Sequence, residues 1–132
     1  MQPQPSQIWD QLDPDQRAVL KTIYQVDRDV ETSTGRSRQV GTRESPAEGV
    51  RRWLDYSPSK FQRSRNLAAV LNRIRLARPY LQIVDLLTSL DLLQTRTVEV
   101  KFIIGGRNHV EKIDQIQLLP LGRQVVEAGS RL

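Results

Sequence analysis

The chain has 132 residues, no cysteine and a formal net charge of +5. Its length fits one domain, and the lack of cysteine excludes disulfides and thiolate metal sites. No apolar run is long enough to span a bilayer, and residues 1–12 lack the basic and apolar segments of a secretory signal, so we expect a cytoplasmic protein with no membrane partner. The high sequence pI of ≈ 10.1 favours an anionic partner, nucleic acid before membrane.

The positive charge is concentrated in the middle of the chain. Residues 1–31 hold three Lys or Arg and six Asp or Glu, residues 32–79 hold eleven and three, and residues 80–132 hold six and six. Ten of the eleven basic residues in the middle are arginine, whose planar guanidinium suits phosphate and guanine. This distribution predicts an electropositive face from the middle segment. A solvated basic surface without a partner is the alternative.

The first third predicts a flexible tail, a helix and a loop. We expect residues 1–12 to be a flexible N-terminal tail. A helix should follow with Asp13 as its N-cap and Pro14 in first position, ending near Arg28. The stretch 31–45 is rich in Ser, Thr, Gly and Arg and predicts a basic loop insertion. Its arginines resemble an arm that orders on a nucleic-acid backbone, although an ordinary surface insertion fits equally well.

Two more helices are expected before Pro79. Ser-Pro pairs are start signals for a short helix over 46–56 and for a longer one over 59–77. Pro79 then ends the longer helix and begins a third, over 79–91. In this third helix Leu81, Val84, Leu87 and Leu90 recur at three-residue spacing, and Ile83 and Leu86 broaden the same face, which predicts burial on most sides.

The last third predicts a β-hairpin and a short helix. Residues 98–104 alternate strictly between apolar and other positions, as in a half-buried strand. Gly105 and Gly106 supply the positive φ angles of a tight turn. In the second strand Ile113 and Ile116 are three residues apart, so we expect a bulge near residues 114–115. Pro120 opens the final helix.

The segments 87–93 and 118–123, LLTSLDL and LLPLGR, flank this hairpin. Together they resemble the second half of a winged helix-turn-helix domain, as in MarR-type and related bacterial transcription regulators. Asp91 stands where that family has glycine, and Leu119 stands where a capping threonine is usual. The resemblance implies a mostly α domain over 13–132 with a small β-hairpin wing. It also implies a homodimeric transcriptional regulator that binds double-stranded DNA.

Two helix-turn-helix registers are possible. If 46–56 and 59–77 form the pair, the exposed start of the longer helix enters the major groove. If 59–77 and 79–91 form the pair, the start of the third helix does so instead. Charge favours the first register, and the resemblance favours the second. The wing tip could reach a minor groove or flanking phosphates. The candidate DNA-binding residues are Arg36, Arg38, Lys60, Arg63, Asn66, Arg73, Arg78, Tyr80, Gln82, Arg107 and Asn108.

Nothing in the sequence points to catalysis. His109 is the only histidine, so no usual zinc set can form and we expect no metal or cofactor. The paired aspartates at helix ends are typical of capping. We therefore expect no enzyme. The rival function is a winged-helix protein-interaction module that binds an acidic protein partner on the basic middle segment.

Overall fold

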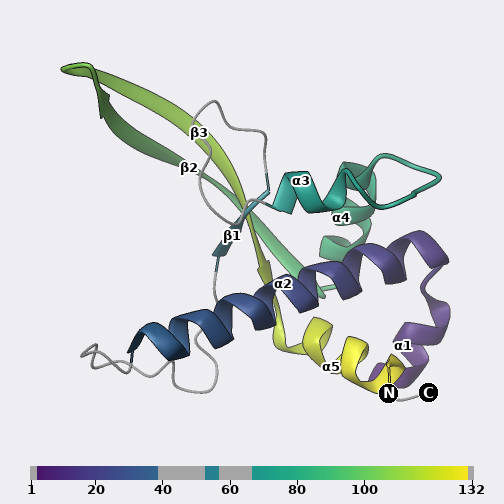
Figure 1. Cartoon of the computed structure of the whole chain (residues 1–132). Coiled ribbons are helices and arrows are strands. Elements are labelled where there is room, and N and C mark those ends of the chain that lie inside the picture. Colours follow the sequence, from purple (N-terminus) through teal and green to yellow (C-terminus); the bar gives the residue numbers. More distant parts are fainter. Residues whose placement is uncertain (1–2, 39–52, 57–66, 131–132) are drawn as a thin grey trace.

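The structure is a computed structural model that describes residues 3–38, 53–56 and 67–130, with the backbone alone for residues 30–38. In these residues it combines helices with one small antiparallel sheet (Figure 1). The elements are α1 (Pro5–Gln11), α2 (Pro14–Arg38), β1 (Trp53–Asp55), α3 (Leu67–Leu71), α4 (Tyr80–Ser89), β2 (Leu93–Ile104), β3 (Arg107–Leu118) and α5 (Pro120–Gly129).

The sheet has the order β1-β3-β2. β2 and β3 form a long hairpin that pairs without interruption from Leu93 opposite Leu118 to Ile104 opposite Arg107. The short strand β1 pairs only with the base of β3. The far half of the hairpin therefore projects beyond the helices (Figure 1).

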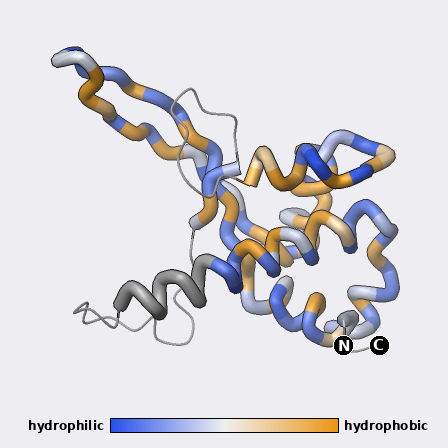
Figure 2. The backbone as a smooth tube through the Cα atoms, in the orientation of Figure 1, coloured by the Kyte–Doolittle hydropathy of each residue, from blue (hydrophilic) through white to orange (hydrophobic). Residues whose placement is uncertain are grey.

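The core lies between the base of the sheet and helices α2, α4 and α5. Ile23 of α2, Leu87 of α4 and Val125 of α5 are fully buried there, with Leu93 and Ile116 from the sheet. Burying one such side chain stabilises the fold by about 1.5–3 kcal/mol. In Figure 2 apolar and polar residues alternate along the helices around this core and along both strands of the hairpin.

Helix α2 begins as the sequence predicts. The backbone N–H of Gln16 donates to Oδ1 of Asp13 at 2.8 Å, and the backbone N–H of Asp13 donates to Oε1 of Gln16 at 2.9 Å. This reciprocal capping box satisfies amide groups that have no partner within the helix. Pro14 occupies the first helical position, where its missing N–H costs nothing.

The prediction of a flexible tail over residues 1–12 is wrong for residues 5–11, which form α1. This helix packs against α5. Leu12 at its end is buried in the core, and Trp9 is half-buried against it. The backbone oxygen of Trp9 also accepts a hydrogen bond from Nε of Arg17 at 3.0 Å. Apolar burial explains why this polar-looking start is ordered.

The predicted loop over 31–45 is also wrong in its first half, because α2 continues to Arg38. Ser, Thr and Gly are weak helix formers. They follow an established helix, however, and each added residue then gains a hydrogen bond without a new nucleation cost. Residues 39–45 lie outside the described part of the chain.

The two helices predicted between 46 and 77 are corrected where the structure describes them. Residues 53–55 are strand β1 rather than helix, and the N–H of Tyr56 continues the pairing by donating to the Asp114 carbonyl at 3.0 Å. Pairing with β3 and the β-preference of Trp and Tyr outweigh the helical pattern. The second helix, α3, ends at Leu71 instead of residue 77. The rest of both predictions, 46–52 and 59–66, lies outside the described residues.

The hairpin turn is confirmed and is tighter than expected. Gly105 and Gly106 have φ angles of 59° and 76°, the backbone of a two-residue type I′ turn. The predicted bulge is wrong, because the register is continuous. Ile113 and Ile116 point to opposite faces of β3 and are both buried. The base of this strand is therefore covered on both faces, which removes the need for a bulge.

Candidate nucleic-acid interface

The structure places the predicted DNA-binding residues in two groups and leaves some undescribed. Residues 60, 63 and 66 lie outside the described part, and residues 36 and 38 are described by backbone alone. The first described group surrounds the connection from α3 to α4, and the second is the hairpin tip. The first group consists of Arg73, Arg78, Tyr80 and Gln82. The second consists of Arg107 and Asn108.

Arg78 is held by the start of α2. Its Nη2 donates to Oδ2 of Asp13 at 2.6 Å, and its Nε lies 3.6 Å from Oδ2 of Asp15. The backbone N–H of Gln16 is the main reason that the pKa of the Asp13 carboxyl is lowered, and Arg78 lowers it further. This arginine therefore fixes the connection between α3 and α4 to α2, and its charge is balanced within the protein.

Tyr80 is half-buried and packs against the core. Burial raises the pKa of its hydroxyl, and the nearby carboxylate of Asp114 adds to the effect. The pKa of Tyr56 is raised by burial first and then by Asp114, Asp85 and Tyr80. The two tyrosines thus share one partly dry environment beside the sheet, where Tyr80 supports the fold more directly than it offers a base contact.

The exposed members of the first group are Arg73 and Gln82. Arg75, two residues from Arg73, is exposed as well, and neither arginine has an ion-pair partner among the described residues. We did not single out Arg75 as a DNA contact from the sequence, although it lies in the same arginine-rich run. An open pocket of ≈ 400 Å³ lies at this connection. Its lining includes Asn72, Ile74, Ala77, Arg78 and Tyr80.

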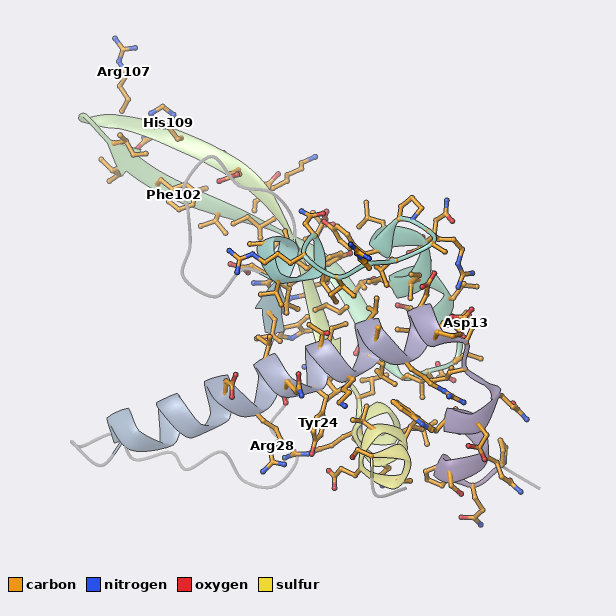
Figure 3. The ribbon with its side chains drawn as sticks, turned by 45° about the vertical axis from the view of Figure 1, so that its right-hand side comes forward. Asp13, Tyr24, Arg28, Phe102, Arg107 and His109 are labelled. Atoms are coloured by element: carbon orange, nitrogen blue, oxygen red, sulfur yellow. The ribbon has the colours of Figure 1, made fainter. Side chains whose placement is uncertain are left out.

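The second group lies on the projecting part of the hairpin. Arg107 flanks the turn and points away from the body of the molecule, while Phe102 and His109 lie directly opposite each other behind it (Figure 3). Lys101 and Lys112 are exposed on the same stretch. None of Lys101, Arg107 and Lys112 forms an ion pair with a described residue. The far half of the hairpin thus offers three unpaired cations.

The outer surface of α4 differs from the sequence prediction. The helix buries only Ile83, Val84 and Leu87, so the expectation of burial on most sides is wrong. Leu81, Leu86 and Leu90 are exposed at 52%, 39% and 45%. Leu86 and Leu90 are four residues apart and lie on one side of the helix, whereas Leu81 lies on another side. Periodicity alone does not show which apolar residues the rest of the fold covers. No lysine or arginine lies within α4.

A polar network that the sequence did not predict braces the base of the sheet. The guanidinium of Arg96 lies 4.1 Å from the centre of the Trp53 ring, and its Nε donates to Oε1 of Gln115 at 2.9 Å. Nε2 of Gln115 in turn donates to Oδ1 of Asp55 at 2.8 Å. Each strand contributes at least one member, so the network links β1 to β2 across β3.

Two other features, a metal site and a membrane-spanning helix, are absent from the described residues. No group of three or more His, Cys, Asp or Glu side chains gathers there as a possible metal site. None of the helices in this part of the chain has the length and apolar character required to cross a membrane. Comparisons with protein-family models, with curated proteins and with solved structures find no match for this chain. Its function must therefore be argued from its own residues.

Proposed function

We propose that the protein is a winged-helix transcriptional regulator that binds double-stranded DNA, with the β2-β3 hairpin as its wing. The observation that carries the proposal is the projecting hairpin with exposed, unpaired Lys101, Arg107 and Lys112. A narrow ribbon of this kind fits a DNA groove, and its cations suit the phosphates on either side. The +8 charge of residues 32–79 supports the same partner.

The order of the elements supports the winged-helix interpretation. The succession α2, β1, α3, α4, β2 and β3 places a helix directly before the hairpin, as the resemblance to MarR-type regulators implies. Asp91 adopts a left-handed conformation with φ of 60°, at the position where those regulators have glycine. α5 follows the hairpin and begins at Pro120 without a side-chain cap, which agrees with leucine in the place of the capping threonine.

The contacts on DNA would be mainly electrostatic. Arg73 and Arg75 stand near the start of α4, and the hairpin cations stand on a separate projection. Of the exposed polar residues of α4, Gln82 has the side chain best suited to read an adenine edge. The absence of a cation in α4 leaves most of the affinity to phosphate contacts, and such affinity falls steeply with salt.

The test is fluorescence anisotropy of a labelled random-sequence duplex over a salt series. We compare the wild type with the variant Lys101→Gln/Arg107→Gln. The control variant, Lys21→Gln/Arg123→Gln, removes the same net charge from helices α2 and α5. Because each lost phosphate contact lowers the slope of log K against log[salt] by about 0.9, the hairpin variant should lose up to about 1.8 of slope. Equal slopes for the two variants would contradict the wing assignment.

The exposed leucines of α4 favour a second candidate function, binding of an acidic protein. A partner with both carboxylates and apolar side chains would match Leu86 and Leu90 at the end of α4 together with Arg73 and Arg75 before its start. A labelled amphipathic helical peptide of Glu and Leu is a suitable probe. Leu86→Glu/Leu90→Glu should abolish its binding, whereas Gln82→Ala should not. Peptide binding together with no duplex binding at low salt would select this function over the first.

A further inference from the structure

Among the described residues, the outer edge of β2 is a long strand edge without a partner. β2 is the last strand of the sheet order, so no described strand pairs with its outer side. It contains no proline and no bulge, and at 12 residues it extends for about 40 Å. Natural sheets usually protect such an edge with proline, a bulge, a very short strand or charged side chains. Of these devices β2 has only the charged side chains, such as Glu99 and Lys101, and a partner strand with the opposite charges in the facing positions can pair with it.

The hairpin register fixes which backbone groups face outward. In a two-residue turn the flanking residues form a hydrogen-bonded pair, here Ile104 and Arg107. Hydrogen-bonded and non-hydrogen-bonded pairs alternate along an antiparallel ladder. The even-numbered residues of β2 therefore direct their N–H and C=O groups to β3, and the odd-numbered residues direct theirs outward. Thr97, Glu99, Lys101 and Ile103 carry the outward groups at the projecting end.

We propose that two copies of the chain pair antiparallel through their β2 edges, about a two-fold axis at Val100. In this arrangement Glu99 of each copy lies opposite the partner's Lys101. Both residues have outward backbone groups, so the pair is a hydrogen-bonded one. Two-fold symmetry produces this opposite-charge pair twice, and such cross-strand pairs stabilise a sheet.

Charge selects this register over its neighbours. Because the outward residues of one copy must lie opposite outward residues of the other, the two-fold axis always passes through a residue. The nearest alternative registers therefore have the axis at Glu99 or at Lys101. An axis at Glu99 would place two glutamates directly opposite each other, and an axis at Lys101 would do the same with two lysines. Like charges directly opposite are destabilising. The axis at Val100 gives opposite charges on both sides.

The two faces of the joined sheet also match. On one face Val98 lies opposite the partner's Phe102, and Val100 lies opposite its own copy, which makes a continuous apolar stripe. On the other face, Glu99 lies between two lysines. Lys112 is its neighbour within the hairpin, and the partner's Lys101 is its neighbour across the interface. The result is one sheet of the order β1-β3-β2-β2-β3-β1. This interface is separate from α1 and α5, which pack against each other.

The first test is a charge exchange followed by sedimentation velocity. Wild type should be a dimer at tens of micromolar concentration. Glu99→Lys and Lys101→Glu should each weaken dimerisation about tenfold or more, since both symmetric pairs become repulsive. Mixing the two variants should restore a dimer, because every lysine then faces a glutamate, and the double variant E99K/K101E should also dimerise. A monomeric wild type, or variants that fail to rescue each other, would overturn the proposal.

The second test is a disulfide at the axis. The chain has no cysteine, so Val100→Cys introduces a single thiol. Its Cα would lie about 4.5 Å from its own copy, within the range that a disulfide spans. The control Val98→Cys is on the same face of the same strand, but its copy would lie about 14 Å away. Rapid crosslinking of V100C alone is the expected result, and equal crosslinking of both would contradict the register.

Lys101 belongs to both proposals, so DNA binding is compared with dimerisation in the wild type and not in the charge variants. A wild-type monomer that binds duplex DNA with a steep salt dependence would overturn the edge pairing and leave the proposed function intact. A wild-type dimer that does not bind DNA, and in which V100C crosslinks while V98C does not, would do the reverse.

Discussion

Arg78 and Asp13 join the connection before α4 to the first turn of α2, with 2.6 Å between Nη2 and Oδ2. Beside them, Oδ1 and Oδ2 of Asp15 accept the backbone N–H of Ala77 at 3.3 Å and 3.2 Å. Two aspartates at the start of a helix thus anchor a segment more than sixty residues later. The electropositive middle of the chain is tied to its acidic start.

The variant Arg78→Gln should lower the free energy of unfolding by about 0.5–1 kcal/mol, the upper range for a partly exposed ion pair. Urea unfolding measures this change in the free energy of unfolding. Arg75→Gln is the matched control, since that exposed arginine has no ion-pair partner among the described residues, and it should change the stability by less than about 0.5 kcal/mol. Equal losses from the two changes would show that the Asp13 contact adds nothing.

The Asp13 carboxyl makes the stability of the fold depend on pH. Its pKa in the folded state lies below the ordinary value of 3.8, chiefly because the Gln16 amide donates to it and secondarily because of Arg78. A lowered folded pKa stabilises the protein above pH 3.8, and this contribution is lost as pH falls through the folded pKa. Asp13→Asn keeps a capping oxygen but cannot titrate. Between neutral and low pH, the free energy of unfolding measured in urea should fall less for the variant than for the wild type. An equal fall would contradict this role of Asp13.

Gly122 in the first turn of α5 leaves no room for a side chain. A Cβ there would overlap the backbone oxygen of Leu92 and press on Leu118. Backbone cannot move aside as a flexible side chain can, so Gly122→Ala should cost about 1–3 kcal/mol despite the better helix propensity of alanine. Gln124→Ala on the exposed side of the same helix is the control. A melting temperature of G122A equal to or above that of the control would contradict this explanation.

Local signals predicted the features whose causes are local. The N-cap at Asp13 and the glycine turn at 105–106 each depend on a few neighbouring residues, and both are present in the structure. The alternation over 98–104 likewise matches the observed strand. These are cases in which chain stereochemistry decides the outcome without distant contacts.

Features that depend on distant partners were missed. Residues 53–55 read as the end of a helix, but their strand exists because β3 pairs with them some sixty residues later. Arg78 was expected to contact phosphate, and its partner Asp13 could not be found from spacing. Helix α4 was expected to be buried on most sides and is not, because a helical pattern does not reveal how many sides of a helix the fold covers.

Tyr80 provides the last prediction, because its hydroxyl should resist ionisation only while the protein is folded. Burial raises its pKa above the ordinary 10.0, and Asp114 raises it further. A phenol whose folded pKa is raised contributes stability below pH 10 that is lost as pH rises through the folded value. The chain has three tyrosines, so Tyr24→Phe/Tyr56→Phe leaves Tyr80 alone to titrate. Ultraviolet absorbance of tyrosinate should give a midpoint above 10.0 in the folded protein and a return to 10.0 in urea. The same midpoint in both conditions would place Tyr80 in solvent and return it to the residues free to contact DNA.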